Sequence, residues 1–152
     1  MRLNNRISFK EGQLLPTFDY TVTVLNRLKG ADSALKQDVW YATVIDNCDF
    51  TQSVVRNVNG NVVSVGGTYR CLVPKQDNYM PYNKWKKSPD GNLTFSEGDY
   101  IIKGTLSEDE IPTPNTIQKI FQAHRPEAFQ IKTFSDNTGT IELAEHYQLE
   151  GV

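Results

Sequence analysis

Residues 54–65 have the sequence VVRNVNGNVVSV, and this segment gives the clearest indication of the fold class. Valines stand on both sides of Asn59-Gly60, and valine favours extended strands. A two-residue type I′ turn needs positive φ angles at both central residues, which Asn and Gly adopt at little cost. We therefore predict a β-hairpin centred on Asn59-Gly60. Gly66-Gly67 is expected to end its second strand or to form a bulge.

More strands are predicted on both sides of this hairpin. Apolar and polar residues alternate from Tyr20, which predicts a half-buried strand to about Leu28. Residues 39–45, VWYATVI, are apolar at both alternating positions, which predicts a central strand. Shorter strands are expected at residues 68–73, 99–104, 129–133 and 147–150.

The chain carries one helix signal, at about residues 113–124. Thr113 suits an N-cap, and Pro114 suits the first helical position. Four residues at helical spacing share one face: Ile117, Ile120, Phe121 and His124. Pro126 ends the helix because proline disfavours α geometry in the residue before it. A helix this short is not stable alone, so we expect it to pack on the sheet. Negative charge at residues 108–110 is expected to favour its N-terminus.

The length of 152 residues suits one domain. We assign residues 1–17 to a polar N-terminal arm and residues 18–152 to a single β-barrel-like domain. Strands do not alternate with helices, so a doubly wound parallel sheet is disfavoured. The prediction is an all-β fold, a small antiparallel barrel or sandwich with one packed helix. Residues 74–98 contain three prolines and no period, which predicts a long loop.

Composition excludes several classes of function. Sixteen Lys and Arg residues oppose eighteen Asp and Glu residues, a net charge of −2, so a strongly basic nucleic-acid binder is disfavoured. No apolar run approaches the roughly 18 residues of a membrane span. Cys48 and Cys71 are expected to be small buried apolar residues, with a disulfide between adjacent strands as the alternative in oxidising surroundings. The two histidines and the acidic residues match no catalytic or metal-binding spacing, so we predict neither an enzyme nor a cofactor.

Charge is split along the chain. Residues 1–37 carry six positive and three negative side chains, a net charge of +3. Residues 104–152 carry three positive and eight negative side chains, a net charge of −5. Identical subunits with such an asymmetry can attract one another head to tail, and such contacts close into rings when the rotation allows.

The loop at residues 74–98 holds the candidate site. Its aromatic and basic side chains are candidates for contact with a neighbouring subunit, and the resemblance described below adds a channel as a second possible contact: Tyr79, Tyr82, Lys84, Trp85, Lys86 and Lys87. A simpler interpretation is a solvated loop whose aromatic rings pack on its own domain or on a neighbour. A third is a patch that stacks nucleic-acid bases on the rings and binds phosphates with the lysines.

The order of these features resembles small minor-capsid or head–tail connector proteins of tailed bacteriophages and prophages of Gram-positive bacteria. The resemblance covers about residues 18–152. It rests on the strands at residues 20–26 and 39–45, the hairpin, the loop with Trp85, and the segment FQIKTFSDN at residues 129–137. Its sharpest part is GDYIIKG at residues 98–104.

The resemblance implies a head-completion or stopper protein of the virion neck, assembled in the cytoplasm of the host bacterium. Such proteins are β-barrels that form rings, commonly hexameric, between the portal or adaptor ring and the tail terminator. They lie near packaged DNA without reading its sequence, and they use neither cofactor nor membrane. In that family a long loop can reach the axial channel, and residues 74–98 match it by position.

Two alternatives stay open. A tail-completion or tail-terminator ring protein would show the same pattern. An OB-type single-stranded nucleic-acid-binding module would use Tyr79, Tyr82 and Trp85 to stack bases and the loop lysines to bind phosphates. The net charge of −2 disfavours the second alternative.

Overall fold

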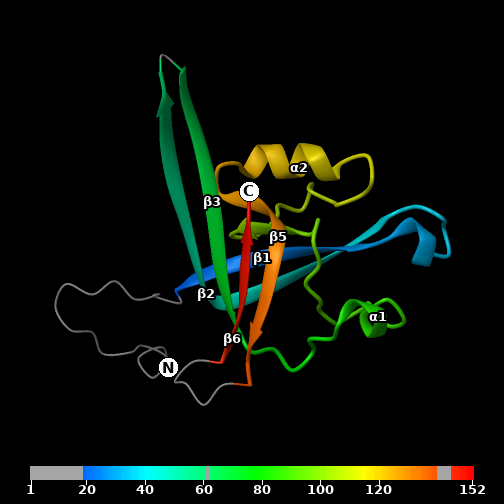
Figure 1. Cartoon of the computed structure of the whole chain (residues 1–152). Coiled ribbons are helices and arrows are strands. Elements are labelled where there is room, and N and C mark those ends of the chain that lie inside the picture. Colours follow the sequence, from blue (N-terminus) through cyan, green and yellow to red (C-terminus); the bar gives the residue numbers. More distant parts are fainter. Residues whose placement is uncertain (1–18, 61, 140–144) are drawn as a thin grey trace.

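A computed structural model describes residues 19–60, 62–139 and 145–152 (Figure 1). The predicted arm at residues 1–17 therefore lies outside the described residues. The strands are β1 Tyr20–Leu28, β2 Val39–Asn59, β3 Val62–Pro74, β4 Tyr100–Lys103, β5 Ala128–Asn137 and β6 His146–Gly151. The helices are α1 Tyr82–Trp85 and α2 Ile117–His124, and a short 3-10 turn spans Gly30–Asp32.

The six strands form a closed antiparallel barrel in the order β1-β2-β3-β6-β5-β4. The predicted fold class, a small all-β barrel with one packed helix, is confirmed. Closure depends on short β4, which pairs with β1 through residues 22–25 and with β5 through residues 128–130. Closing a sheet on itself pairs the strand edges that an open sheet leaves exposed.

β2 is a single strand of 21 residues whose two halves pair with different strands. Residues 39–48 pair with β1, and residues 49–59 pair with β3. Between these halves the register shifts and Asn47 has a φ of 62°, a left-handed conformation that Asn tolerates. The prediction of a central strand at residues 39–45 is wrong. Within the described chain this half pairs with β1 alone, and Val44 is 55% exposed.

The predicted hairpin is confirmed, with a shift of one residue at its turn. Asn59 pairs with Val62, so Asn59 is the last paired residue of β2 rather than the first central residue of the turn. Gly60 has the positive φ of 62° that the turn requires, and residue 61 lies outside the described part. Gly66-Gly67 neither ends β3 nor forms a bulge, because it pairs in register with Val54 and Val55.

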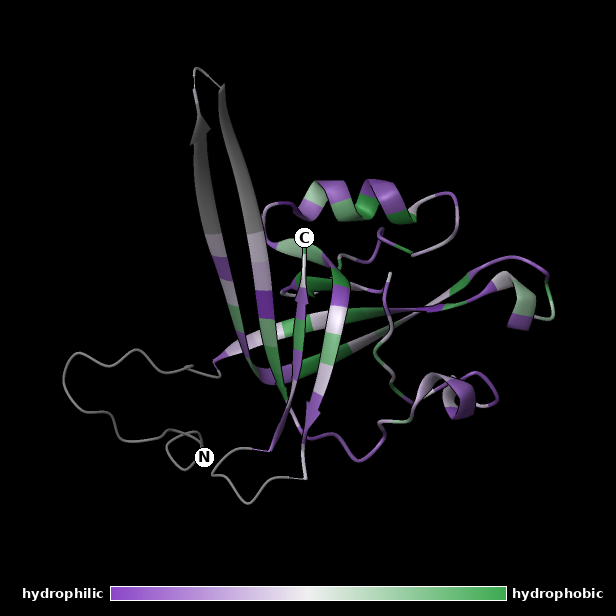
Figure 2. Ribbon diagram, viewed as in Figure 1, coloured by the Kyte–Doolittle hydropathy of each residue, from purple (hydrophilic) through white to green (hydrophobic). Residues whose placement is uncertain are grey.

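The main core fills the barrel, and Figure 2 shows hydrophobic and hydrophilic bands alternating along the strands. Near β6, the rings of Tyr69 and Phe129 stack with centroids 5.5 Å apart, and Phe50 lies 5.7 Å from Phe129. Cys48 and Cys71 are free and fully buried, as predicted. The hydrogen bond between the Cys71 thiol and the neighbouring Cys48, together with burial, raises the pKa of Cys71.

A second core lies outside the barrel, where α2 covers β1, β4 and β5. It is formed by Leu25, Tyr100, Ile102, Ile117, Ile120, Phe121 and Ala128. β1 is thus buried on both faces, and the prediction of a half-buried strand is wrong. The helix begins at Ile117, three residues later than Pro114. Thr113 still accepts a hydrogen bond from the Thr116 N–H at its Oγ1 (3.2 Å), in a turn that precedes α2.

Candidate functional site

Residues 74–98 were predicted as an irregular loop, but Pro74 ends β3 and residues 75–98 form a structured segment against the barrel. Its backbone is tied together by Met80 N–H, which donates to Leu93 O (2.8 Å), and by Leu93 N–H, which donates to Asn78 O (3.0 Å). α1 adds one helical turn that the sequence analysis missed. Leu93 and Phe95 belong to the main core. The segment is therefore a fixed part of the fold in a single chain.

Trp85 is the anchor of α1, and its side chain is fully buried. Its indole N–H donates to Asn92 O (3.2 Å), and its ring meets Tyr41 of β2 edge-on at 5.6 Å. The placement of Trp85 on a surface that contacts a subunit or a channel is therefore wrong for this structure. It belongs to the interior, as the simpler interpretation of the loop allowed.

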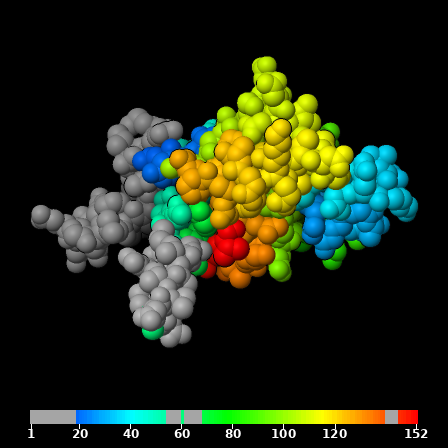
Figure 3. Space-filling view, turned by 90° about the horizontal axis from the view of Figure 1, so that it is seen from above, coloured from blue at the N-terminus to red at the C-terminus, as the bar shows by residue number. Residues whose placement is uncertain are grey.

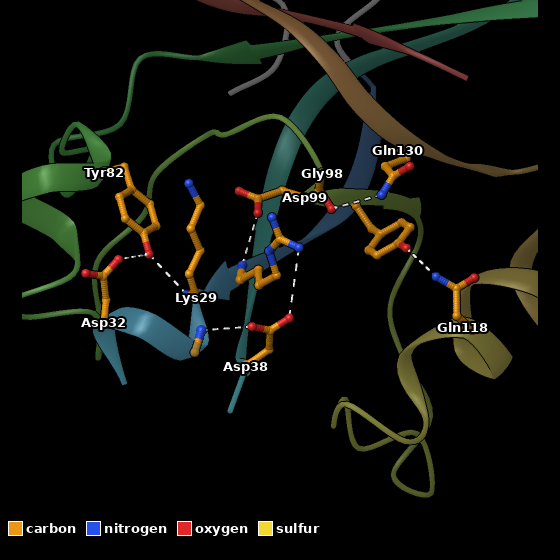
Figure 4. Close-up of polar contacts among 11 residues, drawn as sticks. Lys29, Asp32, Asp38, Tyr82, Gly98, Asp99, Gln118 and Gln130 are labelled. Atoms are coloured by element: carbon orange, nitrogen blue, oxygen red, sulfur yellow. Dashed lines mark hydrogen bonds and ion pairs between the residues drawn. The ribbon is translucent and has the colours of Figure 1, made fainter. Parts of the chain in front are cut away.

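Tyr82 joins α1 to the connector between β1 and β2, residues 29–38 (Figure 4). Its hydroxyl donates to Asp32 Oδ2 (2.9 Å) and accepts from the Lys29 N–H (3.0 Å). Lys86 Nζ lies 3.4 Å from Asp32 Oδ1. The hydrogen bond from Tyr82 lowers the pKa of Asp32. These contacts hold α1 and the turn after it against the end of β1 and the connector, and we call residues 27–38 and 82–90 together the basic corner.

Charge gives the basic corner its name. Residues 27–38 and 82–90 together carry six positive and three negative side chains, a net charge of +3. Arg27 and Lys86 are paired with Asp38 and Asp32. Lys36, Lys84 and Lys87 are exposed and make no ion pair within the described residues. Two of the predicted contact residues, Lys84 and Lys87, therefore do lie on an open surface.

Tyr79 takes a different direction from Tyr82 and Trp85. It packs with Tyr147 at 4.7 Å, Phe95 at 5.7 Å and Phe134 at 5.9 Å. Burial raises the pKa values of Tyr79 and Tyr147. The six predicted site residues thus divide among the basic corner, the interior and this aromatic cluster. A row of three exposed rings that could stack bases is not present among them.

Asp99 holds the end of this segment to β1 and was not identified from the sequence. Its Oδ1 accepts from the Arg27 N–H (3.0 Å), and its Oδ2 accepts from Asn26 Nδ2 (2.9 Å) and the Ser96 N–H (3.0 Å). Burial raises the pKa of Asp99 to about 7, although these three donors and the Arg27 charge lower it. The sequence analysis placed Asp99 in a strand at residues 99–104, whereas β4 begins at Tyr100.

The raised pKa of Asp99 predicts that stability depends on pH. The unfolded pKa is about 3.9, so the folded state binds the proton more tightly. This stabilising contribution is fully present below about pH 4 and is lost as the pH rises to about 7. In urea unfolding, we expect the free energy of unfolding of wild type to fall across this range, relative to Asp99→Asn, by on the order of 1 kcal/mol per pH unit.

Asp90→Asn is the matched control, because Asp90 is exposed on a turn of the same segment. Its free energy of unfolding should change with pH in parallel with that of wild type. If the free energies of unfolding of wild type and Asp99→Asn change with pH in parallel, the pKa of Asp99 is not raised by folding.

Glu110 has a different role from the one predicted. Its carboxylate lies 2.8 Å from Nε2 of His124, the last residue of α2, and not at the helix N-terminus. It also accepts from the Ser107 N–H (2.9 Å), and that hydrogen bond, ahead of His124, lowers its pKa. The residues before α2 therefore run back along the helix. This places Glu110 beside the last residue of α2, and not at the N-terminus, where its charge was expected to act.

Other kinds of site find no support in the part of the chain that the structure describes. No three His, Cys, Asp or Glu side chains there are grouped so that they could hold a metal ion. None of the described helices is long and apolar enough to cross a membrane.

A family model described as "Family of unknown function (DUF6751)" matches residues 17–152. No curated protein and no solved structure matches the chain significantly.

Proposed function

The chain belongs to the DUF6751 family, and we propose that it is a structural subunit that forms rings. Following the resemblance of its sequence, we place it in the neck of a tailed bacteriophage. There it acts as a head–tail connector of the stopper type, between the portal or adaptor ring and the tail.

The observation that supports this proposal is the projecting β2–β3 hairpin (Figure 1). Among the described strands, β3 before residue 69 pairs with β2 alone, and β2 after residue 48 pairs with β3 alone. A two-stranded ribbon is only marginally stable in water. Its unpaired backbone groups are also a template for pairing with another chain. A neighbouring subunit in an assembly would supply the missing contacts.

A second open edge supports the same proposal. Residues 39–47 of β2 pair with β1 on one side, and no described strand pairs with their other side. This edge contains no lysine or proline at residues 39–45, the devices that commonly protect strand edges. Two different open edges on one chain suit heterologous contacts, which close into rings.

The OB-type alternative is less well supported. It would need Trp85 on the surface, and the indole is buried. A tail-completion ring would have the same barrel and hairpin, so it differs from the proposed stopper only in the ring to which it binds.

Shortening the hairpin tests the proposal. A variant that lacks residues 55–66 and joins Val54 to Gly67, a cross-strand pair, through Asn-Gly keeps the barrel strands. We expect the full chain to self-associate in sedimentation velocity at concentrations of tens of micromolar, and the variant to sediment as a monomer. The far-UV circular dichroism of the variant should still show a β-protein. A wild-type chain that remains monomeric, alone and with the adaptor and tail rings, would count against the proposal.

A further inference from the structure

We propose that adjacent copies of this chain contact each other through two charged surfaces, the basic corner of one copy and the segment at residues 107–111 of the next. This inference rests on the proposed ring and names its second contact, distinct from the hairpin. We call residues 107–111 the acidic turn.

The basic corner offers an exposed aliphatic side chain bordered by free cations. Leu35 is 69% exposed, among the most exposed large hydrophobic residues described. Lys36 follows it directly, Lys84 lies in the adjoining α1, and Lys87 lies in the turn after that helix. The hydrogen bonds of Tyr82 and the burial of Trp85 hold this surface in place without a partner. Binding would therefore cost little additional ordering of the backbone.

The acidic turn offers the complementary surface. Ile111 is 66% exposed, and Glu108 and Asp109 beside it are exposed with no ion pair in the described part of the chain. Two contacts of Glu110 fix the turn. Its N–H donates to Ser107 O (3.0 Å), and its carboxylate lies 2.8 Å from Nε2 of His124. No Lys or Arg occurs at residues 104–118, so the net charge of that stretch is −3.

The two surfaces lie on different sides of the molecule. In Figure 3, the connector of the basic corner projects in cyan on the right, and the yellow-green residues before α2 project at the top. Each surface repels a copy of itself and attracts the other. This arrangement disfavours a two-fold dimer through either surface and favours a head-to-tail contact, the kind that generates rings.

A second copy is the partner that fits both surfaces at once. The basic corner and the acidic turn each present one large exposed aliphatic residue with unpaired charges beside it, and the charges of the two surfaces are opposite in sign. A nucleic acid could meet the basic corner but would be repelled by the acidic turn. The contact is small and polar, so we expect it to set orientation and association rate more than affinity.

Charge reversal tests the contact. The variants Lys84→Glu/Lys87→Glu and Glu108→Lys/Asp109→Lys change exposed side chains only, so thermal unfolding should be unchanged. We expect each variant to raise the dissociation constant of self-association, measured by sedimentation, by about tenfold in 50 mM NaCl. Mixing the two variants should restore association, because the reversed surfaces are again complementary. The difference from wild type should shrink in 0.5 M NaCl, where screening is strong.

Lys119→Glu/Lys132→Glu is the matched control for Lys84→Glu/Lys87→Glu, since it changes the net charge equally at exposed positions of α2 and β5 whose lysines make no ion pair within the described residues. It should associate like wild type. If wild type associates and all three variants associate equally, this contact is overturned while the proposed ring survives. If wild type never associates, both are overturned. Loss of oligonucleotide binding in Lys84→Glu/Lys87→Glu, with association intact, would reassign the basic corner to nucleic acid.

Discussion

Replacing Gly151 with alanine is expected to lower the free energy of unfolding by about 3 kcal/mol or more. A Cβ at this position would lie only 1.8 Å from Gln130 O and 2.8 Å from Cδ2 of Phe129. The first of these atoms is backbone, so rotation of a side chain cannot relieve the clash. Gly151 sits in β6 between Tyr69 of β3 and Ile131 of β5.

The Gly151→Ala substitution also destabilises the aromatic packing around Phe129. Phe129 stacks on Tyr69, so moving it to admit a methyl group disturbs the main core. A domain with a typical stability of about 5–15 kcal/mol would keep little margin after such a loss. Urea unfolding followed by tryptophan fluorescence measures the change.

Gly139→Ala is the control, because a Cβ at Gly139 meets nothing within 4 Å. Its free energy of unfolding should change by less than about 1 kcal/mol. If Gly151→Ala is as stable as Gly139→Ala, then β5 and β6 are not packed as closely as the structure describes.

Replacing Trp85 with alanine is the second large effect. Trp85 is the largest fully buried side chain, and truncating a buried tryptophan costs about 3–5 kcal/mol. It lies outside the main core cluster, so we expect the loss to release α1 from Tyr41 while the barrel survives. Limited trypsin digestion should then cut first after Lys84, Lys86 or Lys87.

Two companion variants separate the causes. Trp85→Phe keeps an aromatic ring and loses the hydrogen bond to Asn92, so its loss of stability should be smaller. Asn83→Ala changes an exposed neighbour in α1, keeps all three lysines, and should digest like wild type. Equal digestion of Trp85→Ala and wild type would show that α1 is held by something other than this indole.

The features that the sequence predicted well are those with a local physical cause. Asn59-Gly60 predicted the hairpin because positive φ angles are a local requirement. The turn lies one residue later because cross-strand pairing, which is not local, sets its register. The apolar stripe of α2 was recognised because helical spacing alone places Ile117, Ile120 and Phe121 on one face.

The features that were missed depend on contacts distant in sequence. β1 looked half-buried because nothing in its own residues shows that α2 covers its polar face. Trp85 looked like a surface contact because its burial depends on Tyr41, 44 positions away, and on Asn92. The three hydrogen bonds that the Asp99 carboxylate accepts likewise depend on Asn26 and Arg27 of β1, more than 70 positions away.

The mass of the particle that the full chain forms is the most direct test of the proposed ring. Native mass spectrometry should be recorded at increasing protein concentration, alone and with the neighbouring adaptor and tail rings. A closed ring predicts one dominant oligomer at a fixed multiple of 17.2 kDa, six if the resemblance holds. A single 17.2 kDa species under every condition would contradict the ring, and an open series of growing oligomers would contradict its closure.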